Sequence, residues 1–448
     1  MKNKTIKIYD STLRDGAQTK GVSFSIDDKL RILDILMDIG VDYIEAGWPG
    51  ANPIDDELFK NLPAKFKSKV VAFGMMRKKN KSASNDPGLN AVLNSGVSTT
   101  CLVGKSWDFH VKSALRISNS ENLEMINDSI DYASTKLDEV MFDAEHFFDG
   151  YKSNPKYSLD VIKTAWNAGA KWIVLCDTNG GTLPYELSSI INDVKNIIPP
   201  ENLGVHFHND TDNATYNSIE AVRLGVKQVQ GTFNGLGERC GNSNLVNVAA
   251  NLILKMNYEC KLKKKINKIT SASRLIDEIL NRQSSRNLPF VGSAAFAHKG
   301  GLHISAVEKN PKSYEHIDPI SVGNERLLVV SNQSGKSNVV NKLKKFRIDI
   351  KGKEKKIEEF LELIKNQESL GFAYDGAEAS FELLSRRTFQ NFKEFYSLET
   401  FKVSDEKIKN DKGEFKPFSE ARVKIFVGKK EFYSASEGNG PIHALDNA

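Results

Sequence analysis

The feature that most constrains this chain is a pattern that occurs eight times within residues 1–256. Each time, a short run of apolar and often β-branched residues is followed by a longer segment with helical periodicity. The apolar runs predict strands at residues 4–9, 42–46, 69–73, 98–103, 139–143, 172–176, 203–207 and 228–232. Segments 26–39 and 123–136 are two of the predicted helices, and glycines such as Gly40 and Gly96 stand just ahead of strands, where helices commonly end.

Eight strand–helix units in about 250 residues are typical of a closed (β/α)8 barrel, the TIM barrel. The competing architecture, an open doubly wound sheet, has fewer strands and a glycine-rich first turn, which this sequence lacks. We therefore predict an α/β fold in which residues 1–268 form the barrel. Helices with longer loops indicate helical linker subdomains at 269–370, and alternating apolar runs at 395–400 and 421–426 indicate an α+β domain at 371–448.

Polar residues follow most of the predicted strands, and in a barrel the carboxyl ends of the strands form the functional face. Any single one of them is compatible with a helix cap or a turn, since Asp, Asn and Thr favour both. Their recurrence at one strand end after another favours a functional site. The residues concerned are Arg14, Asp15, Glu45, Glu145, Asp177, Thr178, His206, His208, Asn209, Asp210, Asn234, Glu238, Arg239 and Asn242.

Two histidines stand close together on the seventh predicted strand, in the string GVHFHND at 204–210. Alternation of side chains puts His206 and His208 on one face, roughly 6 to 7 Å apart, which suits two ligands of one metal. Two histidines on a half-buried strand are an equally good interpretation of the pair alone. Asp15 and the weaker oxygen donor Asn242 come from neighbouring strand ends, and this mixed set suits Mg²⁺, Mn²⁺ or Zn²⁺ with open positions. We therefore predict a catalytic divalent metal site.

The glycine-rich string GLGERCG, at 235–241, follows the last predicted strand. Its spacing and its position both differ from a dinucleotide fingerprint. A phosphate or coenzyme loop is the favoured interpretation, because barrels often bind phosphate at this end, and a tight turn is the alternative. A second string, SNQSGKSN at 331–338, lacks the first glycine of a Walker loop, so we predict no nucleotide site there.

Composition argues against nucleic acid and membrane as binding partners. The chain carries 62 basic and 57 acidic residues, a net charge of +5, and its lysine runs at 261–268 and 351–356 lack interleaved aromatics, so we predict no nucleic-acid binding. No apolar stretch approaches the length of a membrane span. Four cysteines without C-x-x-C spacing and a start without a leader pattern predict a reduced, cytoplasmic protein.

Several motifs together carry a family resemblance. The strings STLRDG with Gln18 after it, HFHND, NGLGERCGN and the later HKGGLH resemble those of the acyl-CoA condensing enzymes of the DRE-TIM metallolyase superfamily, which are the 2-isopropylmalate, homocitrate and citramalate synthases. The strings FDAEHFFDGYK and YEHIDP are most similar to those of the citramalate synthase branch. The resemblance spans essentially the whole chain.

The resemblance implies a role for each candidate residue. It makes Asp15, His206, His208 and Asn242 the metal site. It places Arg14 against the carbonyl oxygen of a 2-oxo acid as a catalytic and substrate-binding group, and Thr178 on the substrate carboxylate. The implied catalytic groups of the acid/base step are Glu145 and His303, with Tyr314 closing the pocket. The candidate coenzyme A residues are Asn209, Asn234, Gly235, Gly237, Glu238 and Arg239.

The reaction implied by the resemblance is a metal-assisted Claisen-type condensation. Acetyl-CoA, pyruvate and water would give (R)-citramalate and CoA, an acyl transfer in isoleucine biosynthesis. A 2-isopropylmalate synthase acting on 2-oxoisovalerate, or a homocitrate synthase acting on 2-oxoglutarate, is the alternative, since one or two methylenes are worth only about 1 to 3 kcal/mol in a pocket. A barrel that binds metal and CoA without turnover, or a lyase that runs the reverse cleavage, is a third possibility.

The region after the barrel also has implied roles. The linker subdomains resemble the flexible ones that, in this family, reach over the active site of a partner subunit, so the active form would be at least a homodimer. Residues 371–448 resemble the opening of the family's C-terminal allosteric domain. The chain ends where a helix is expected after Gly440 and Pro441, so we expect this α+β regulatory domain to be incomplete and isoleucine to be an effector only if it is completed.

Overall fold

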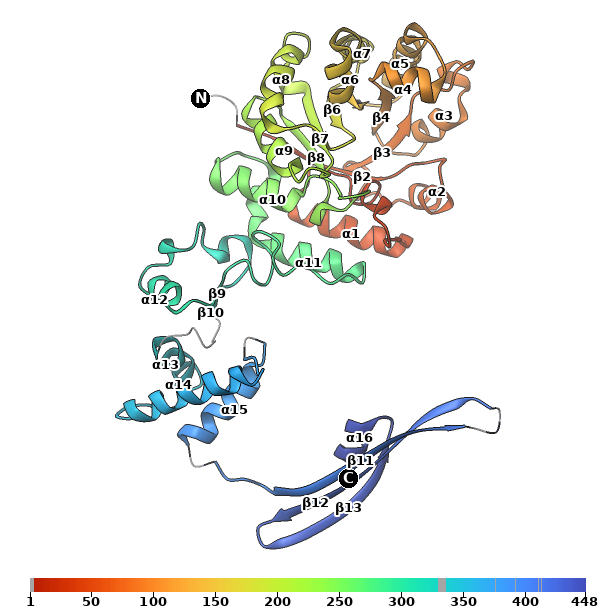
Figure 1. Cartoon of the computed structure of the whole chain (residues 1–448). Coiled ribbons are helices and arrows are strands. Elements are labelled where there is room, and N and C mark those ends of the chain that lie inside the picture. The colour runs from red at the N-terminus through yellow and green to blue at the C-terminus, as the bar shows by residue number, and fades with distance from the viewer. Residues whose placement is uncertain (1–3, 329–335, 375, 391, 410, 412) are drawn as a thin grey trace. The chain divides into compact units, whose positions relative to one another are not determined.

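The computed structural model describes residues 4–328, 336–374, 376–390, 392–409, 411 and 413–448, and most of the string at 331–338 therefore lies outside the described residues. Its first part is a closed barrel of eight parallel strands in chain order, in which β8 pairs with β1 (Figure 1). The strands are β1 (Lys7–Asp10), β2 (Tyr43–Gly47), β3 (Val70–Met75), β4 (Thr99–Lys105), β5 (Glu139–Glu145), β6 (Trp172–Asp177), β7 (Leu203–Phe207) and β8 (Gln228–Gly231). The predicted barrel is confirmed.

Helices follow the strands and cover the barrel. Those of this part are α1 (Ile26–Ile39), α2 (Pro53–Lys60), α3 (Pro87–Leu93), α4 (Asp108–His110), α5 (Asn119–Ser134), α6 (Phe147–Ser153), α7 (Pro155–Asn167), α8 (Leu187–Lys195), α9 (Ala214–Arg223), α10 (Leu245–Ala250) and α11 (Ile269–Ile279). Helix α1 has the predicted bounds, because Ser25 and Asp28 form a capping box at its start and Gly40 ends it at φ 91°. Helix α5 begins before the predicted residue 123, since Ser118 caps a polar first turn that apolar periodicity does not reveal.

Alternation along the strands divides the core into two layers. Inward side chains such as Tyr9, Cys101 and Met141 pack together inside the barrel. Their neighbours in the chain, such as Leu102 and Phe142, pack outward against the helices. This period of two leaves polar side chains at the carboxyl ends of the strands facing the mouth of the barrel.

The chain divides into two compact units. The first contains the residues up to His298 together with Ala306–Leu327, and the second contains Lys299–Ser305 together with Leu328–Ala448. Strand β9 (Ala297–His298) pairs with β10 (Leu327–Leu328), and α12 (Gly301–Lys309) lies between them in the sequence. The predicted domain bounds at 268 and 370 stay a prediction.

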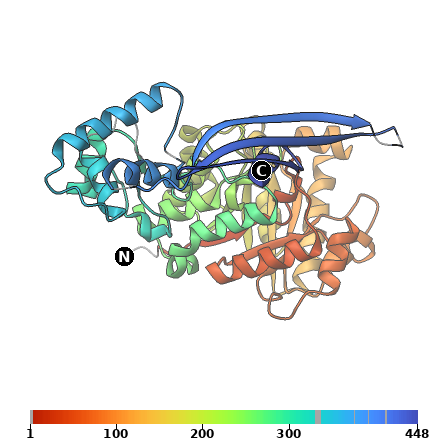
Figure 2. The same ribbon diagram turned by 90° about the horizontal axis from the view of Figure 1, so that it is seen from below.

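The second unit contains a helical cluster and an antiparallel sheet. The helices α13 (Lys336–Lys345), α14 (Glu354–Ser369) and α15 (Glu378–Phe389) share a small apolar core. The sheet has the long strands β11 (Ser397–Lys409), β12 (Phe415–Val427) and β13 (Lys430–Gly438), which run side by side in Figure 2, and α16 (Pro441–Asn447) packs on it. The predicted α+β character of this region is confirmed. Strands β11 and β12 extend beyond the apolar runs at 395–400 and 421–426, and β13 was not predicted.

Two further observations concern the whole described chain. None of its helices combines the length and apolar character that crossing a membrane requires. The four cysteines are free thiols, of which Cys101 and Cys176 are buried and Cys240 is exposed.

Candidate functional site

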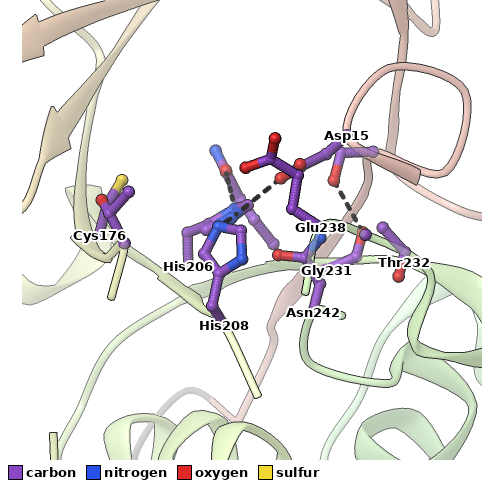
Figure 3. Close-up of polar contacts among 12 residues, drawn as sticks. Asp15, Cys176, His206, His208, Gly231, Thr232, Glu238 and Asn242 are labelled. Atoms are coloured by element: carbon purple, nitrogen blue, oxygen red, sulfur yellow. Dashed lines mark hydrogen bonds and ion pairs between the residues drawn. The ribbon is translucent and has the colours of Figure 1, made fainter. Parts of the chain in front are cut away.

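The predicted metal ligands Asp15, His206 and His208 lie together at the carboxyl end of the barrel. Asp15 is in the turn after β1, His206 is near the end of β7, and His208 lies just after that strand. The Nε2 atom of His206 is 3.2 Å from Oδ2 of Asp15 and 3.4 Å from Nε2 of His208 (Figure 3). All three side chains are buried, and in the described part of the chain they form the one group of three such residues close enough to share an ion.

Two buried polar atoms beside this cluster, Nδ1 of His208 and Oδ1 of Asn242, have no hydrogen-bond partner among the described residues. The Nδ2 atom of Asn242 donates to the carbonyl oxygen of Leu236 at 3.0 Å, so the side-chain oxygen remains available to a ligand. A backbone bridge holds Asn242 next to His208, and Figure 3 shows the two residues close together. Because an unpaired buried oxygen is costly, and because a carboxylate, imidazoles and an amide oxygen suit a divalent cation, the residues present fit a metal ion.

The charges of Asp15 and His208 also suit a cation. Burial alone would raise the pKa of Asp15, but the charge of Arg14 and a hydrogen bond from His206 lower it well below its usual range. Burial and the neighbouring His206 lower the pKa of His208 to about 3. At neutral pH, Asp15 is therefore an anion and His208 a neutral imidazole, which are the forms that bind metal.

Two buried residues that sequence analysis missed, Gln230 and Asp143, hold the orientation of His206. The Nδ1 atom of His206 lies 3.1 Å from Oε1 of Gln230, and Nε2 of Gln230 donates to Oδ1 of Asp143 at 3.1 Å. The second bond fixes which end of the Gln230 amide faces the histidine. Since an amide oxygen only accepts, Nδ1 of His206 carries a hydrogen, and Nε2 is the ring nitrogen that faces Asp15 and His208.

Arg14 lies beside this cluster and its guanidinium is held from two sides. Its Nε atom donates to Oε1 of the fully buried Glu45 at 2.5 Å, and the hydroxyl of Tyr9 donates to the other oxygen of Glu45 at 2.6 Å. The Arg14 Cζ atom lies 3.9 Å from the ring centre of Phe73. Burial opposes the charge of Arg14, but Glu45 and Asp15 raise its pKa, so the group is a fixed cation.

Thr178 is one of the residues that line a cavity of about 290 Å³ at the mouth of the barrel. Its Oγ1 atom accepts a hydrogen bond of 2.8 Å from the backbone N–H of His146, so its own hydroxyl hydrogen remains available to an acceptor. The structure brings several predicted site residues together around this cavity. They are Arg14, Asp15, Glu145, Thr178, His206, His208, Glu238 and Arg239.

Glu145 lies at the end of β5 and borders a second cavity as well. This larger cavity, of about 540 Å³, is lined by apolar residues such as Met76 and Leu115 and by Lys78 and Lys79. Glu145 and Lys105 line both cavities, and Nζ of Lys105 lies 2.5 Å from Oε2 of Glu145. Sequence analysis missed Lys105, which is the last residue of β4.

Comparison with known families identifies the family of this chain. Residues 5–276 match the model of the HMGL-like family, and residues 290–370 match the model described as "Homocitrate synthase post-HMGL domain-like". The first match covers more than half of the chain. The chain belongs to the HMGL-like family. The predicted superfamily is therefore confirmed.

Comparison with individual relatives distinguishes between branches of the HMGL-like family. The chain is 47% identical over 445 residues to an (R)-citramalate synthase of Aquifex aeolicus, covering 99% of this chain and 84% of that protein. It is 46% identical over 446 residues to one of Geobacter sulfurreducens, with the same coverage. A 2-isopropylmalate synthase of Sulfurisphaera tokodaii is 33% identical over 333 residues, covering 74% of this chain and 83% of that protein. The citramalate synthases are thus the more similar of the two, as the motifs predicted.

Solved structures of HMGL-like proteins share the fold. The hydroxymethylglutaryl-CoA lyase from Pseudomonas aeruginosa superposes with a TM-score of 0.53 at 21% identity, covering 65% of this chain and 96% of that one. The similarity at this identity concerns the barrel architecture.

The glycine-rich loop of this HMGL-like chain is packed tightly against Asn242, one of the candidate metal ligands. A Cβ atom at Gly237 would lie 2.3 Å from Nδ2 of Asn242, and one at Gly241 would lie 1.9 Å from the carbonyl oxygen of Gly235. Arg239 donates to Asp210 at 2.7 Å and to the carbonyl oxygen of Thr178 at 2.8 Å. These contacts give the loop a structural role at the mouth of the barrel.

The other coenzyme candidates near this loop also have protein partners. The Asn234 amide both donates to the backbone of Ser273 and accepts from its hydroxyl, and Asn209 bonds to Asp212 and to the backbone of Ala214. The assignment of these residues and of Gly235, Gly237, Glu238 and Arg239 to coenzyme A stays a prediction.

The catalytic candidates after the barrel lie on other segments. His303 is on α12, within the part of that helix that belongs to the second unit. Tyr314 belongs to the first unit, has an exposed fraction of 49%, and is followed by Glu315, which accepts hydrogen bonds of 2.5 and 2.6 Å from Arg326. The predicted roles of His303 and Tyr314 stay predictions.

Proposed function

We propose that this chain is an acyltransferase that condenses acetyl-CoA with pyruvate and water to give (R)-citramalate and CoA, in isoleucine biosynthesis. One observation carries the proposal. A cavity lined by a candidate divalent-metal ligand set and a fixed arginine shares Glu145 with a larger cavity that has an apolar wall and two lysines. The similarity to (R)-citramalate synthases over 99% of the chain supports this choice of reaction.

The 2-oxo acid would lie in the smaller cavity. Asp15, His206, His208 and Asn242 would hold the metal, which as a Lewis acid supplies polarisation of the 2-oxo carbonyl. Arg14 would donate to the same carbonyl oxygen and stabilise the negative charge that develops there, since Glu45 and Phe73 prevent the guanidinium from moving away. The hydroxyl of Thr178 would donate a hydrogen bond to the substrate carboxylate.

The acetyl group would meet the 2-oxo acid at Glu145. In this position the carboxylate can take a proton from the methyl carbon, and we propose that it acts as an acid/base unit with His303. The carbon nucleophile then attacks C2 of the 2-oxo acid, and water hydrolyses the thioester. A water-poor site favours removal of the methyl proton, because the methyl group is a weak carbon acid.

The larger cavity is the place we propose for the coenzyme arm. Its apolar wall suits the pantetheine chain, and the exposed Lys78 and Lys79 at its rim suit phosphates. Replacing both lysines by alanine should raise KM for acetyl-CoA about tenfold while leaving KM for pyruvate unchanged. The variant Arg239→Ala tests the alternative placement on the 235–241 loop, which would gain support if this variant alone raised KM for acetyl-CoA.

We propose further that the active form is a cytoplasmic homodimer, and that isoleucine is an effector if the C-terminal regulatory domain is completed. The long sheet of the second unit supports a second copy as partner, because Phe401, Phe432 and Tyr433 are exposed on it. Light scattering should give twice the chain mass, and isoleucine should inhibit CoA release when the regulatory domain is completed. A monomer with full activity would contradict the dimer proposal.

A free-thiol assay of CoA release tests the reaction itself. Purified protein would receive acetyl-CoA with pyruvate, 2-oxoisovalerate or 2-oxoglutarate, with Mn²⁺ or Mg²⁺ and with EDTA. We expect release with pyruvate and its loss in EDTA. A strong preference for 2-oxoisovalerate would instead assign the chain to the 2-isopropylmalate synthases.

A further inference from the structure

Lys105 and Glu145 are direct neighbours across two barrel strands. Strands β4 and β5 pair in parallel with Lys105 opposite Glu145 in register, at the last residue of each. The backbone N–H and the hydroxyl of Ser106 both donate to the carbonyl oxygen of Glu145, at 3.1 and 2.6 Å, and Asn122 donates to the carbonyl oxygen of Lys105 at 2.9 Å. Both backbones are therefore fixed where their side chains meet.

The Lys105 ammonium group has hydrogens to spare. Its Nζ atom lies 2.5 Å from Oε2 of Glu145, and this carboxylate is its one hydrogen-bond or ion-pair partner among the described residues. An ammonium carries three hydrogens. The side chain is 16% exposed and lines both the metal-side cavity and the larger cavity, so the remaining hydrogens lie at their junction.

The reaction needs a donor at this junction. When the methyl C–H bond of a thioester breaks, the proton goes to a base, the electron pair forms a carbon–carbon double bond, and the carbonyl π pair moves onto the thioester oxygen. A hydrogen-bond donor fixed beside that oxygen lowers the barrier and commonly raises kcat by a factor of about 10² to 10³. In the proposed function, Arg14 and the metal ligands would be engaged with the other substrate, the 2-oxo acid.

We propose that Lys105 is a further catalytic residue, which donates a hydrogen bond to the thioester oxygen of acetyl-CoA while Glu145 receives the methyl proton. The inference rests on the proposed function. The enolate carbon then forms a bond to C2 of the 2-oxo acid, and the thioester carbonyl is restored. The negative charge therefore leaves the thioester oxygen beside Lys105 and forms on the former 2-oxo oxygen beside Arg14. Lys105 stays protonated throughout, and no further reactant is needed.

The alternative is that Lys105 only orients Glu145. Three variants separate the two roles: Lys105→Met removes the charge, Lys105→Arg keeps an ion pair with Glu145, and Lys105→Ala leaves room for an added amine. The matched control is Lys112→Met, which makes the same change of charge at an exposed lysine seven residues away that lines neither cavity. Steady-state rates would be measured with ordinary and methyl-deuterated acetyl-CoA, using whichever 2-oxo acid the wild-type protein prefers.

We expect Lys105→Met to lower kcat about 100-fold or more and to raise the deuterium isotope effect, because proton removal becomes slower than the other steps. Metal affinity, measured by competition with a chelating dye, should stay within twofold of wild type. Small alkylammonium ions should restore part of the rate of Lys105→Ala and none of the rate of Glu145→Gln. Lys112→Met should behave as wild type.

Several results would overturn the inference. These are an unchanged kcat in Lys105→Met, a lower kcat with no rise in the isotope effect, a loss of metal affinity that accounts for the lower rate, or Lys105→Ala without rescue by any amine. If Lys105→Met does not fold, a wild-type rate in Lys105→Arg together with no amine rescue of Lys105→Ala would show a purely orienting role. Failure of the wild-type protein with every 2-oxo acid would instead contradict the proposed function.

Discussion

Replacing Gln230 by leucine should weaken metal binding without disturbing any metal ligand. Gln230 is fully buried and accepts the hydrogen of His206 Nδ1 at 3.1 Å. Leucine has a similar size but no acceptor, so this hydrogen would be unpaired and the ring of His206 would be free to turn or to change tautomer. Loss of such a partner behind a metal-bound histidine typically costs about 10- to 100-fold in affinity, or about 1.4 to 2.7 kcal/mol.

The same substitution removes a donor from Asp143, which is also buried. An unpaired buried group costs about 1 to 3 kcal/mol of folding free energy, so the metal-free variant should also unfold more easily. The control Gln228→Leu separates the two effects. Gln228 precedes Gln230 by two residues on β8, is equally buried, and bonds to Met141 instead of the histidine.

The assay is a titration of metal-free protein with Mn²⁺ or Zn²⁺ in competition with a chelating dye, combined with urea unfolding of the metal-free state. We expect weaker metal binding for Gln230→Leu and wild-type metal binding for Gln228→Leu. Wild-type affinity in Gln230→Leu would refute the argument that this amide holds the ligand geometry of His206. Equal weakening in both variants would show a general effect of changing the barrel interior.

Three further predictions concern other parts of the molecule. His206→Ala should abolish metal-dependent CoA release and leave the circular dichroism spectrum unchanged. Gly237→Ala should lower metal affinity at least tenfold in the dye assay, because its Cβ atom would displace the amide of Asn242, and unchanged affinity would contradict this. Arg326 lowers the pKa of Glu315, so this pair stabilises the fold above pH 4.5 and loses its effect as the pH falls; Glu315→Gln should cost about 1 to 3 kcal/mol in urea unfolding at pH 7 and much less at pH 3.

The barrel and the candidate metal ligands at its mouth were predictable because both depend on local pattern. Strand and helix periodicity gave the eight units, and the positions just after the strands gave Arg14, Asp15 and Glu145. The same approach misjudged the start of α5, where a serine cap precedes the apolar pattern. It also could not distinguish glycines that bind a ligand from glycines that lie against another backbone, which in the case of Gly237 and Gly241 requires coordinates.

Two of the positions that sequence analysis missed, Lys105 and Gln230, differ in how far they could have been found. Each is a register partner of a predicted residue on the next strand, Lys105 of Glu145 and Gln230 of His206. Lys105 and Glu145 both lie two residues beyond the predicted ends of their strands, so aligning those ends at the barrel mouth places them side by side. His206 lies one residue before its predicted strand end and Gln230 lies two before its own, so the same alignment pairs His206 with Gly231. A closed barrel must stagger its strands, and the places where neighbouring strands shift are set by packing around the whole ring. Partners at the mouth of a barrel can therefore be inferred from sequence only where no shift falls between two strands.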